Sequence, residues 1–176
     1  MFIIRPIKKN EATGELALLY KKIEKSLGFL PAHFELFATI DMESLKDFVE
    51  YNLYFNKHPN IDAGLLPYLR LYIAHSECRD YCISLNSKML VAQGISKDIV
   101  RNITKNLDNI PLEKEQILLL KKVLDAVYNA KEFGNKDLGE LYIAGFSDKD
   151  FYELLSYATN FMAKSKMIEV YLKYNK

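Results

Sequence analysis

Both cysteines of the chain fall within one short stretch, residues 65–94, with the sequence LLPYLRLYIAHSECRDYCISLNSKMLVAQG. Four polar or nucleophilic side chains recur there at steps of three or four residues: His75, Cys78, Cys82 and Asn86. Arg79 precedes Cys82 by three residues, and a nearby guanidinium favours the thiolate, which is the reactive form of cysteine. The spacing predicts a thiol site centred on Cys82. The alternative is an inert core thiol, because free cysteine is among the most buried residue types.

The apolar residues around the cysteines indicate the element that carries them. They recur with helical spacing at Leu66, Leu69, Ile73, Ile83 and Leu90, which predicts one long helix through residues 65–94 with Pro67 in its first turn. Residues four apart on such a helix have Cβ atoms about 6 Å apart, whereas a disulfide needs about 4 Å. A bridge between Cys78 and Cys82 would therefore require a turn of helix to unwind.

His75 is the other candidate for chemistry in this stretch. It precedes Cys82 by seven residues, roughly 10 Å along a helix, so a general-base role would need an intervening water. His75 and the two cysteines offer three possible metal ligands, but no second cysteine cluster supplies a fourth, so we expect no metal. Glu77 could add a carboxylate to the site. His33 and His58 stand beside prolines, and we interpret them as turn or surface residues.

Composition narrows the classes of function. The chain has 176 residues, 49% of them hydrophobic, and a formal net charge of +1, which favours a single domain (1–176, with 1–12 as an extended lead-in) and neither nucleic-acid nor membrane partners. The opening MFIIRPIKKN lacks the features of a secretory signal, and no apolar run reaches the length of a membrane span. We expect a cytoplasmic protein. No Gly-rich phosphate loop or other cofactor motif is present, and we expect no cofactor.

Helix start and stop signals follow one another along the rest of the chain. Thr13 and Gly28 bracket a first helix, Asp41 caps a helix to about residue 57, and Ser96 caps the helix that follows the cysteine stretch. Ser147 and Asp150 have the spacing of a capping box at the start of the last helix. Strand signals are absent. The fold class predicted is all-α, with about seven or eight helices.

The run RDYCISLNSKMLVAQGISKDIV resembles the core of the AhpD-like alkylhydroperoxidase and carboxymuconolactone decarboxylase superfamily. Redox members of that superfamily carry Cys-x-x-Cys, then three residues and a His. Cys82 matches the second cysteine, while Arg79 stands at the first cysteine, Asn86 at the His, and Pro67 at an upstream glutamate. LGFLPAHF also resembles a Gly-Phe-x-Pro turn of peroxidase-related members. The resemblance implies an AhpD-like helical fold and a homo-oligomer.

Three functions remain open. The first is a weak thiol-dependent hydroperoxide reductase acting through Cys82, with Cys78, His75, Arg79 and Asn86 as further site residues. The second is a carboxymuconolactone-decarboxylase-like enzyme on a small organic acid, which predicts a pocket beside the cysteine helix with a cationic group facing it. The third is a non-catalytic oligomeric helical protein.

Overall fold

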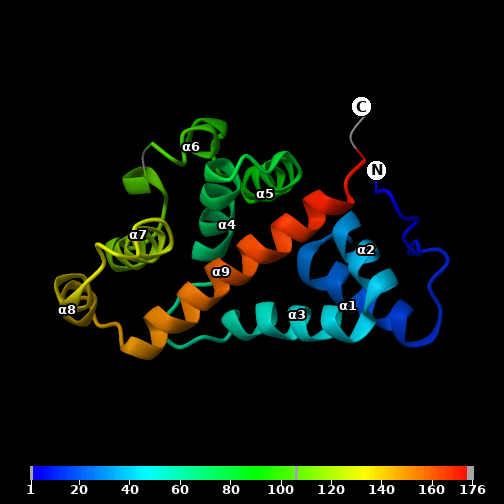
Figure 1. Cartoon of the computed structure of the whole chain (residues 1–176), viewed down its shortest axis with the longest axis horizontal. Helices are drawn as coiled ribbons and strands as arrows, with labels where there is room; N and C mark the ends of the chain where they lie inside the picture. Colours follow the sequence, from blue (N-terminus) through cyan, green and yellow to red (C-terminus); the bar gives the residue numbers. More distant parts are fainter. Residues whose placement is uncertain (1, 106, 174–176) are drawn as a thin grey trace. The chain divides into compact units, whose positions relative to one another are not determined.

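The structure is a computed structural model that describes residues 2–105 and 107–173 (Figure 1). Within these residues it has nine α-helices, one short 3-10 helix and no strand beyond an isolated bridge between Phe2 and Leu172. The helices are α1 (Gly14–Leu27), α2 (Ala32–Ile40), α3 (Met42–Phe55), α4 (Leu65–Ser76), α5 (Asp80–Ala92), α6 (Lys97–Arg101), η1 (Leu107–Asn109), α7 (Lys114–Tyr128), α8 (Asn135–Ile143) and α9 (Asp148–Tyr171). None of the described helices is long and apolar enough to cross a membrane. The all-α prediction is confirmed.

Most of the predicted helix boundaries are those of the structure. Gly28 ends α1 in the left-handed region, with φ of 80°, where glycine carries no steric penalty. The side chains of Asp41 and Ser96 accept hydrogen bonds from backbone N–H groups in the first turns of α3 and α6. At the start of α9, Ser147 and Asp150 bond each other's backbone N–H groups, at 2.7 and 3.2 Å. The capping-box prediction is therefore confirmed.

The predicted single helix over residues 65–94 is wrong. The chain forms two helices there, because α4 ends at Ser76, α5 begins at Asp80, and Cys78 between them has a positive φ of 53°. The backbone N–H of Arg79 donates to the carbonyl of Ala74 at 2.8 Å, so carbonyl groups of α4 are satisfied as the chain turns. The apolar period continues through this turn, which is why the pattern did not reveal it. With this break the described residues form nine α-helices, where the sequence predicted about seven or eight.

The described residues form two compact units, which are described separately. The first unit contains residues 2–57 and 170–173. In it α3 packs against α1 and α2, with Leu36 and Leu45 almost fully buried. The N-terminal lead-in bonds to the C-terminal segment through the N–H of Ile3 and the carbonyl of Tyr171, at 2.8 Å.

The second unit contains residues 58–169. Here α4 packs against both α5 and α7, α5 contacts α6, and α7 contacts α8 (Figure 1). The core of this unit is built from side chains of α4, α7 and α9 that are almost completely inaccessible to solvent: Leu69, Ile73, Leu119, Leu120, Val123 and Leu154. Helix α4 is thus the central support for the α5 and α6 segment.

The interpretation of His33 and His58 as turn or surface residues is wrong. His33 lies in the first turn of α2, is 8% exposed, and its ring makes edge contacts with two phenylalanines of the same helix. The side chain of His58 is 1% exposed. Its Nδ1 accepts backbone N–H groups of Asn60 and Ile61 at 3.2 and 2.9 Å, and its Nε2 lies 2.8 Å from a carboxylate oxygen of Glu153. The loop after Pro59 folds back onto the ring, which local sequence signals do not show.

Candidate functional site: a thiol turn and a cationic groove

Cys82 lies in the first turn of α5 and is 3% exposed. Burial raises the pKa of its thiol to about 11, because a thiolate loses hydration when it is removed from water. The positive charges of Arg79 and Arg70 lower this pKa, and the carboxylate of Glu169 raises it further, but burial is the largest effect. At neutral pH the Cys82 thiol is therefore protonated.

The guanidinium of Arg79 is engaged by carboxylates. One of its terminal nitrogens pairs with Glu169 on α9, and the other lies 3.5 Å from a carboxylate oxygen of Glu77. Its Nε is buried and has no hydrogen-bond partner among the described residues. The carboxylate of Glu169 also raises the pKa of the Cys82 thiol, so it offsets part of the effect of Arg79.

Cys78 is exposed and sits in the turn between α4 and α5. Both cysteines are free thiols. Because Cys78 has left-handed and not helical backbone angles, the Cβ separation of a regular helix does not apply to the pair. The prediction that Cys78 and Cys82 do not form a disulfide remains untested. The break in the helix removes the geometric argument on which that prediction was based.

Asn86 belongs to a buried polar network that the sequence did not reveal. Asn86 is 2% exposed; its amide donates to the carbonyl of Cys82 at 2.8 Å and its oxygen accepts from Nε of Arg70 at 2.9 Å. Arg70, on α4, also donates to the hydroxyl of Tyr157 on α9 at 2.6 Å. Among the described residues no carboxylate lies within 4.0 Å of Arg70. The one signal in the sequence was a lone arginine inside the apolar segment LLPYLRLYIA.

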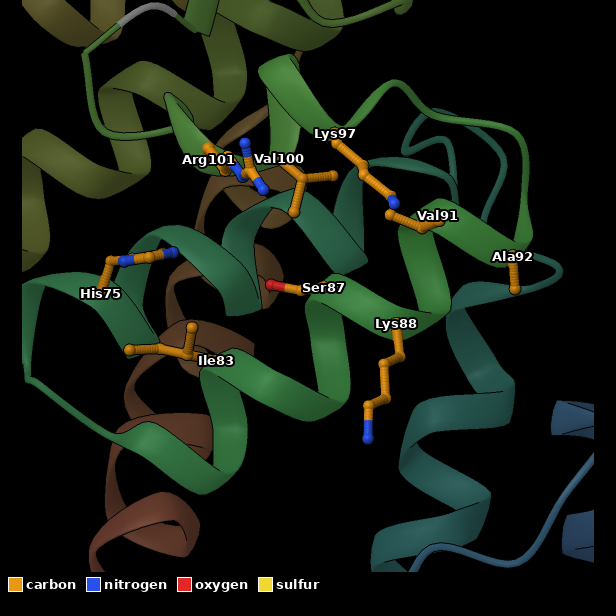
Figure 2. A pocket seen from close by; sticks show the side chains of 9 residues that line it. All are labelled: His75, Ile83, Ser87, Lys88, Val91, Ala92, Lys97, Val100 and Arg101. Atoms are coloured by element: carbon orange, nitrogen blue, oxygen red, sulfur yellow. The ribbon is translucent and has the colours of Figure 1, made fainter.

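A groove with a volume of about 590 Å³ opens beside the cysteine turn (Figure 2). The end of α4, one face of α5 and the helix α6 supply its lining, which consists of His75, Ile83, Ser87, Lys88, Val91, Ala92, Lys97, Val100 and Arg101. Aliphatic side chains make up more than a third of this lining and form its apolar floor. The second unit alone therefore contains the complete groove.

The groove is cationic. Lys97 and Arg101 are exposed, and in Figure 2 they lie on either side of Val100, with the Lys97 ammonium directed toward Val91. Figure 2 also shows the His75 ring at the opposite end of the groove, while the Lys88 side chain extends away from the other lining residues. No carboxylate is among the lining residues. Within the described part of the chain, none of these four basic side chains takes part in an ion pair.

The structure separates the residues that the sequence grouped as one site. His75 lines the groove, whereas neither cysteine sulfur does. Arg79 and Glu77 pair with each other, and Asn86 faces Arg70. Among the residues described, no group of three or more His, Cys, Asp or Glu side chains is placed to hold a metal ion. Sequence reasoning missed Lys97 and Arg101, because residues of an exposed helix resemble an ordinary solvated surface until α5 is seen beside them.

Comparison of the whole structure defines the class of fold, which is the all-α AhpD-like fold. One similar structure is the alkylhydroperoxidase AhpD core, an uncharacterized peroxidase-related protein from Ralstonia eutropha JMP134, with a TM-score of 0.75, 15% identity, and coverage of 98% of this chain and 92% of that one. Another is an uncharacterized peroxidase-related protein from Silicibacter sp. TM1040, with a TM-score of 0.73, 15% identity, and coverage of 96% and 85%.

Sequence-based comparisons add no relative. No protein-family model matches the chain, and no curated protein matches it. At 15% identity the likeness to the two solved structures concerns the fold, and the predicted AhpD-like architecture is confirmed at that level.

Proposed function

We propose that this AhpD-like protein binds a small organic acid in the groove formed by α4, α5 and α6. The observation that carries the proposal is the combination of basic groups, His75, Lys97 and Arg101, with an apolar floor and no lining carboxylate. A guanidinium is well matched to a carboxylate, which it can bind through two parallel hydrogen bonds. A ligand with an anionic head and a hydrocarbon body complements both parts of the lining.

The groove also contains a side chain suited to proton transfer. His75 is the lining residue of the type most often used in general acid–base catalysis. In a decarboxylase-like reaction, the substrate carboxylate leaves as carbon dioxide, its bonding electrons remain on carbon, and an imidazolium supplies the proton that replaces it. His75 is our candidate for that donor, and Arg101 is our candidate for holding a second anionic group of the substrate.

Binding tests this proposal directly. We expect hexanoate or benzoate to bind saturably, monitored by chemical-shift changes in amide NMR spectra, with the largest changes on α5 and α6. Arg101→Ala should weaken binding at least tenfold, because it removes the bidentate partner, whereas Lys136→Ala serves as the charge-matched control on exposed α8. Added salt should weaken the interaction, since both partners are exposed charges. Absence of saturable binding, or equal binding by Arg101→Ala, would reject the proposal.

A second candidate function is weak thiol-dependent hydroperoxide reduction through Cys82. The observation that favours it is the pair of arginines, Arg70 and Arg79, whose charges both lower the pKa of the Cys82 thiol. Exposed Cys78 in the preceding turn would be the partner thiol. The burial of Cys82 and the carboxylates around Arg79 place this function second, and its pH dependence provides the test described below.

A further inference from the structure

The length of the groove is set by the face of α5 that forms its floor. Ile83, Ser87 and Val91 line it at intervals of four residues, so they lie along one side of the helix. Eight residues separate the first from the last, which corresponds to roughly 12 Å along the helix axis. The groove is therefore elongated and not a compact cup.

Basic groups stand at both ends of this floor. In Figure 2 the His75 ring is at the end near Ile83, and the Lys97 ammonium is at the end near Val91. Arg101 lies on the His75 side of Val100, and Lys97 lies on its other side. Between the two ends the floor is formed by aliphatic side chains and Ser87, while the Lys88 side chain extends away from the other lining residues. Charge is therefore placed at the ends of the groove and hydrocarbon in its middle.

From this arrangement we infer that the groove binds a linear dicarboxylate with a hydrocarbon spacer. This inference rests on the proposed function and narrows its class of ligand. One carboxylate binds at the end of the groove where His75 lies, on the Arg101 side of Val100, and the other pairs with the Lys97 ammonium. The methylene chain covers Ile83, Val91 and Val100. A monocarboxylate of the same length satisfies one end only and leaves its methyl group against the ammonium. A short dicarboxylate cannot reach both ends.

The inference is tested by comparing acids that differ in one property each. Titration calorimetry of the full chain with sebacate, decanoate and succinate, with decanoate kept below its aggregation concentration, varies the second charge and the length separately. We expect sebacate to bind at least tenfold more tightly than either of the others. Lys97→Ala should weaken sebacate binding by a much larger factor than decanoate binding, whereas Lys136→Ala should affect neither acid.

The outcomes separate this inference from the function on which it rests. If decanoate binds as tightly as sebacate, or if Lys97→Ala weakens both acids equally, the dicarboxylate inference is overturned while organic-acid binding stands. If none of the three acids binds, both are overturned. Size-exclusion chromatography with light scattering on the same samples shows whether a second copy of the chain covers the groove, and loss of binding on self-association would also overturn the inference.

Discussion

Burial and nearby positive charges have opposite effects on the pKa of the Cys82 thiol, and their balance determines whether the thiol is reactive. Two guanidinium groups favour the thiolate, but burial favours the thiol more strongly and raises the pKa to about 11. A residue of this kind is an inert core thiol under ordinary conditions and becomes a nucleophile only in alkaline solution. The resemblance singled out Cys82 as the residue to test, but the burial of its sulfur depends on packing that no short motif encodes.

The reactivity of Cys82 should depend steeply on pH. In Cys78→Ser, we expect iodoacetamide to label Cys82 slowly at pH 7, where the thiolate fraction at a pKa of about 11 is on the order of one in ten thousand, and faster at each step toward pH 11. Peroxide consumption through Cys82 should rise over the same range. Mass spectrometry of the labelled peptide measures the rate.

Cys82→Ser, in which Cys78 remains, is the matched control and should label rapidly, because Cys78 is exposed. Rapid labelling of Cys82 at pH 7, with a midpoint below the ordinary thiol value of about 8.5, would contradict the prediction and move the reductase function to first place.

For Asn86, the sequence indicated the position but not the hydrogen-bond partner. Its position was identified from the superfamily motif, where a histidine is usual, but its partner Arg70 lies sixteen residues earlier on another helix. Which polar groups meet in the interior is decided by how α4 and α5 pack. The same holds for the groove, because its basic residues come from α4, α5 and α6 and no local pattern links them.

At the scale of elements, local chemistry predicted where most helices begin and end. Capping by Asp41, Ser96 and Ser147 depends on neighbours within three residues, so the sequence contains the whole signal. The turn at Cys78 was missed for the opposite reason. A cysteine in the left-handed region is unusual, and no glycine or asparagine marked the site.

Substitutions at Cys78 should follow its backbone angles. We expect Cys78→Val to be less stable than Cys78→Gly by about 1 kcal/mol or more, because a β-branched side chain is strained at positive φ whereas glycine is not. The free energy of unfolding in urea, followed by circular dichroism, measures the difference. The same pair at exposed Ser84, inside α5, should show the opposite order, since glycine destabilises a helix interior. A more stable valine at position 78 would contradict the turn.

The capping box of α9 should make the free energy of unfolding depend on pH in the acidic range. Burial alone would raise the pKa of the Asp150 carboxyl, but hydrogen bonds from Ser147 and Asn60 together hold the pKa below its ordinary value of 3.8. A depressed pKa in the folded state contributes stability that is complete above 3.8 and is lost as the pH falls through the folded-state value. Wild type should therefore lose stability below about pH 4.

Asp150→Asn provides the measurement for this prediction. At pH 6 the variant should be less stable by about 1 kcal/mol in urea unfolding, because a weaker acceptor replaces the carboxylate. Below pH 4 the gap between variant and wild type should narrow. Asp148→Asn, at a neighbouring position of the same first turn, is the control. A constant gap from pH 6 to pH 3 would show that the Asp150 carboxylate is not the titrating group.

At the scale of the whole molecule, one helix belongs to both compact units. Helix α9 runs from Asp148 to Tyr171, and the boundary between the units falls at Val170 near its end. The single-domain organisation and the homo-oligomer remain predictions at this scale. For the homo-oligomer, the large apolar side chains exposed on α8, including Ile143 at 91%, are the contact surface that we would test first.

Unfolding should be a single cooperative transition. Because α9 continues across the boundary between the two units, we expect the two units to unfold together. Urea curves followed by far-ultraviolet circular dichroism and by the absorbance of the twelve tyrosines should coincide. Two separated transitions would indicate that residues 58–169 fold as an independent domain.

The enclosed ring of His58 gives the protein an internal probe. Since Nδ1 already accepts two backbone N–H groups, the proton must reside on Nε2, where Glu153 accepts it. A single imidazole tautomer has a distinctive nitrogen-15 spectrum, and the shielded proton should exchange slowly with deuterium oxide. Spectroscopists could thus follow the loop after Pro59 through one native signal, without attaching a dye or a spin label.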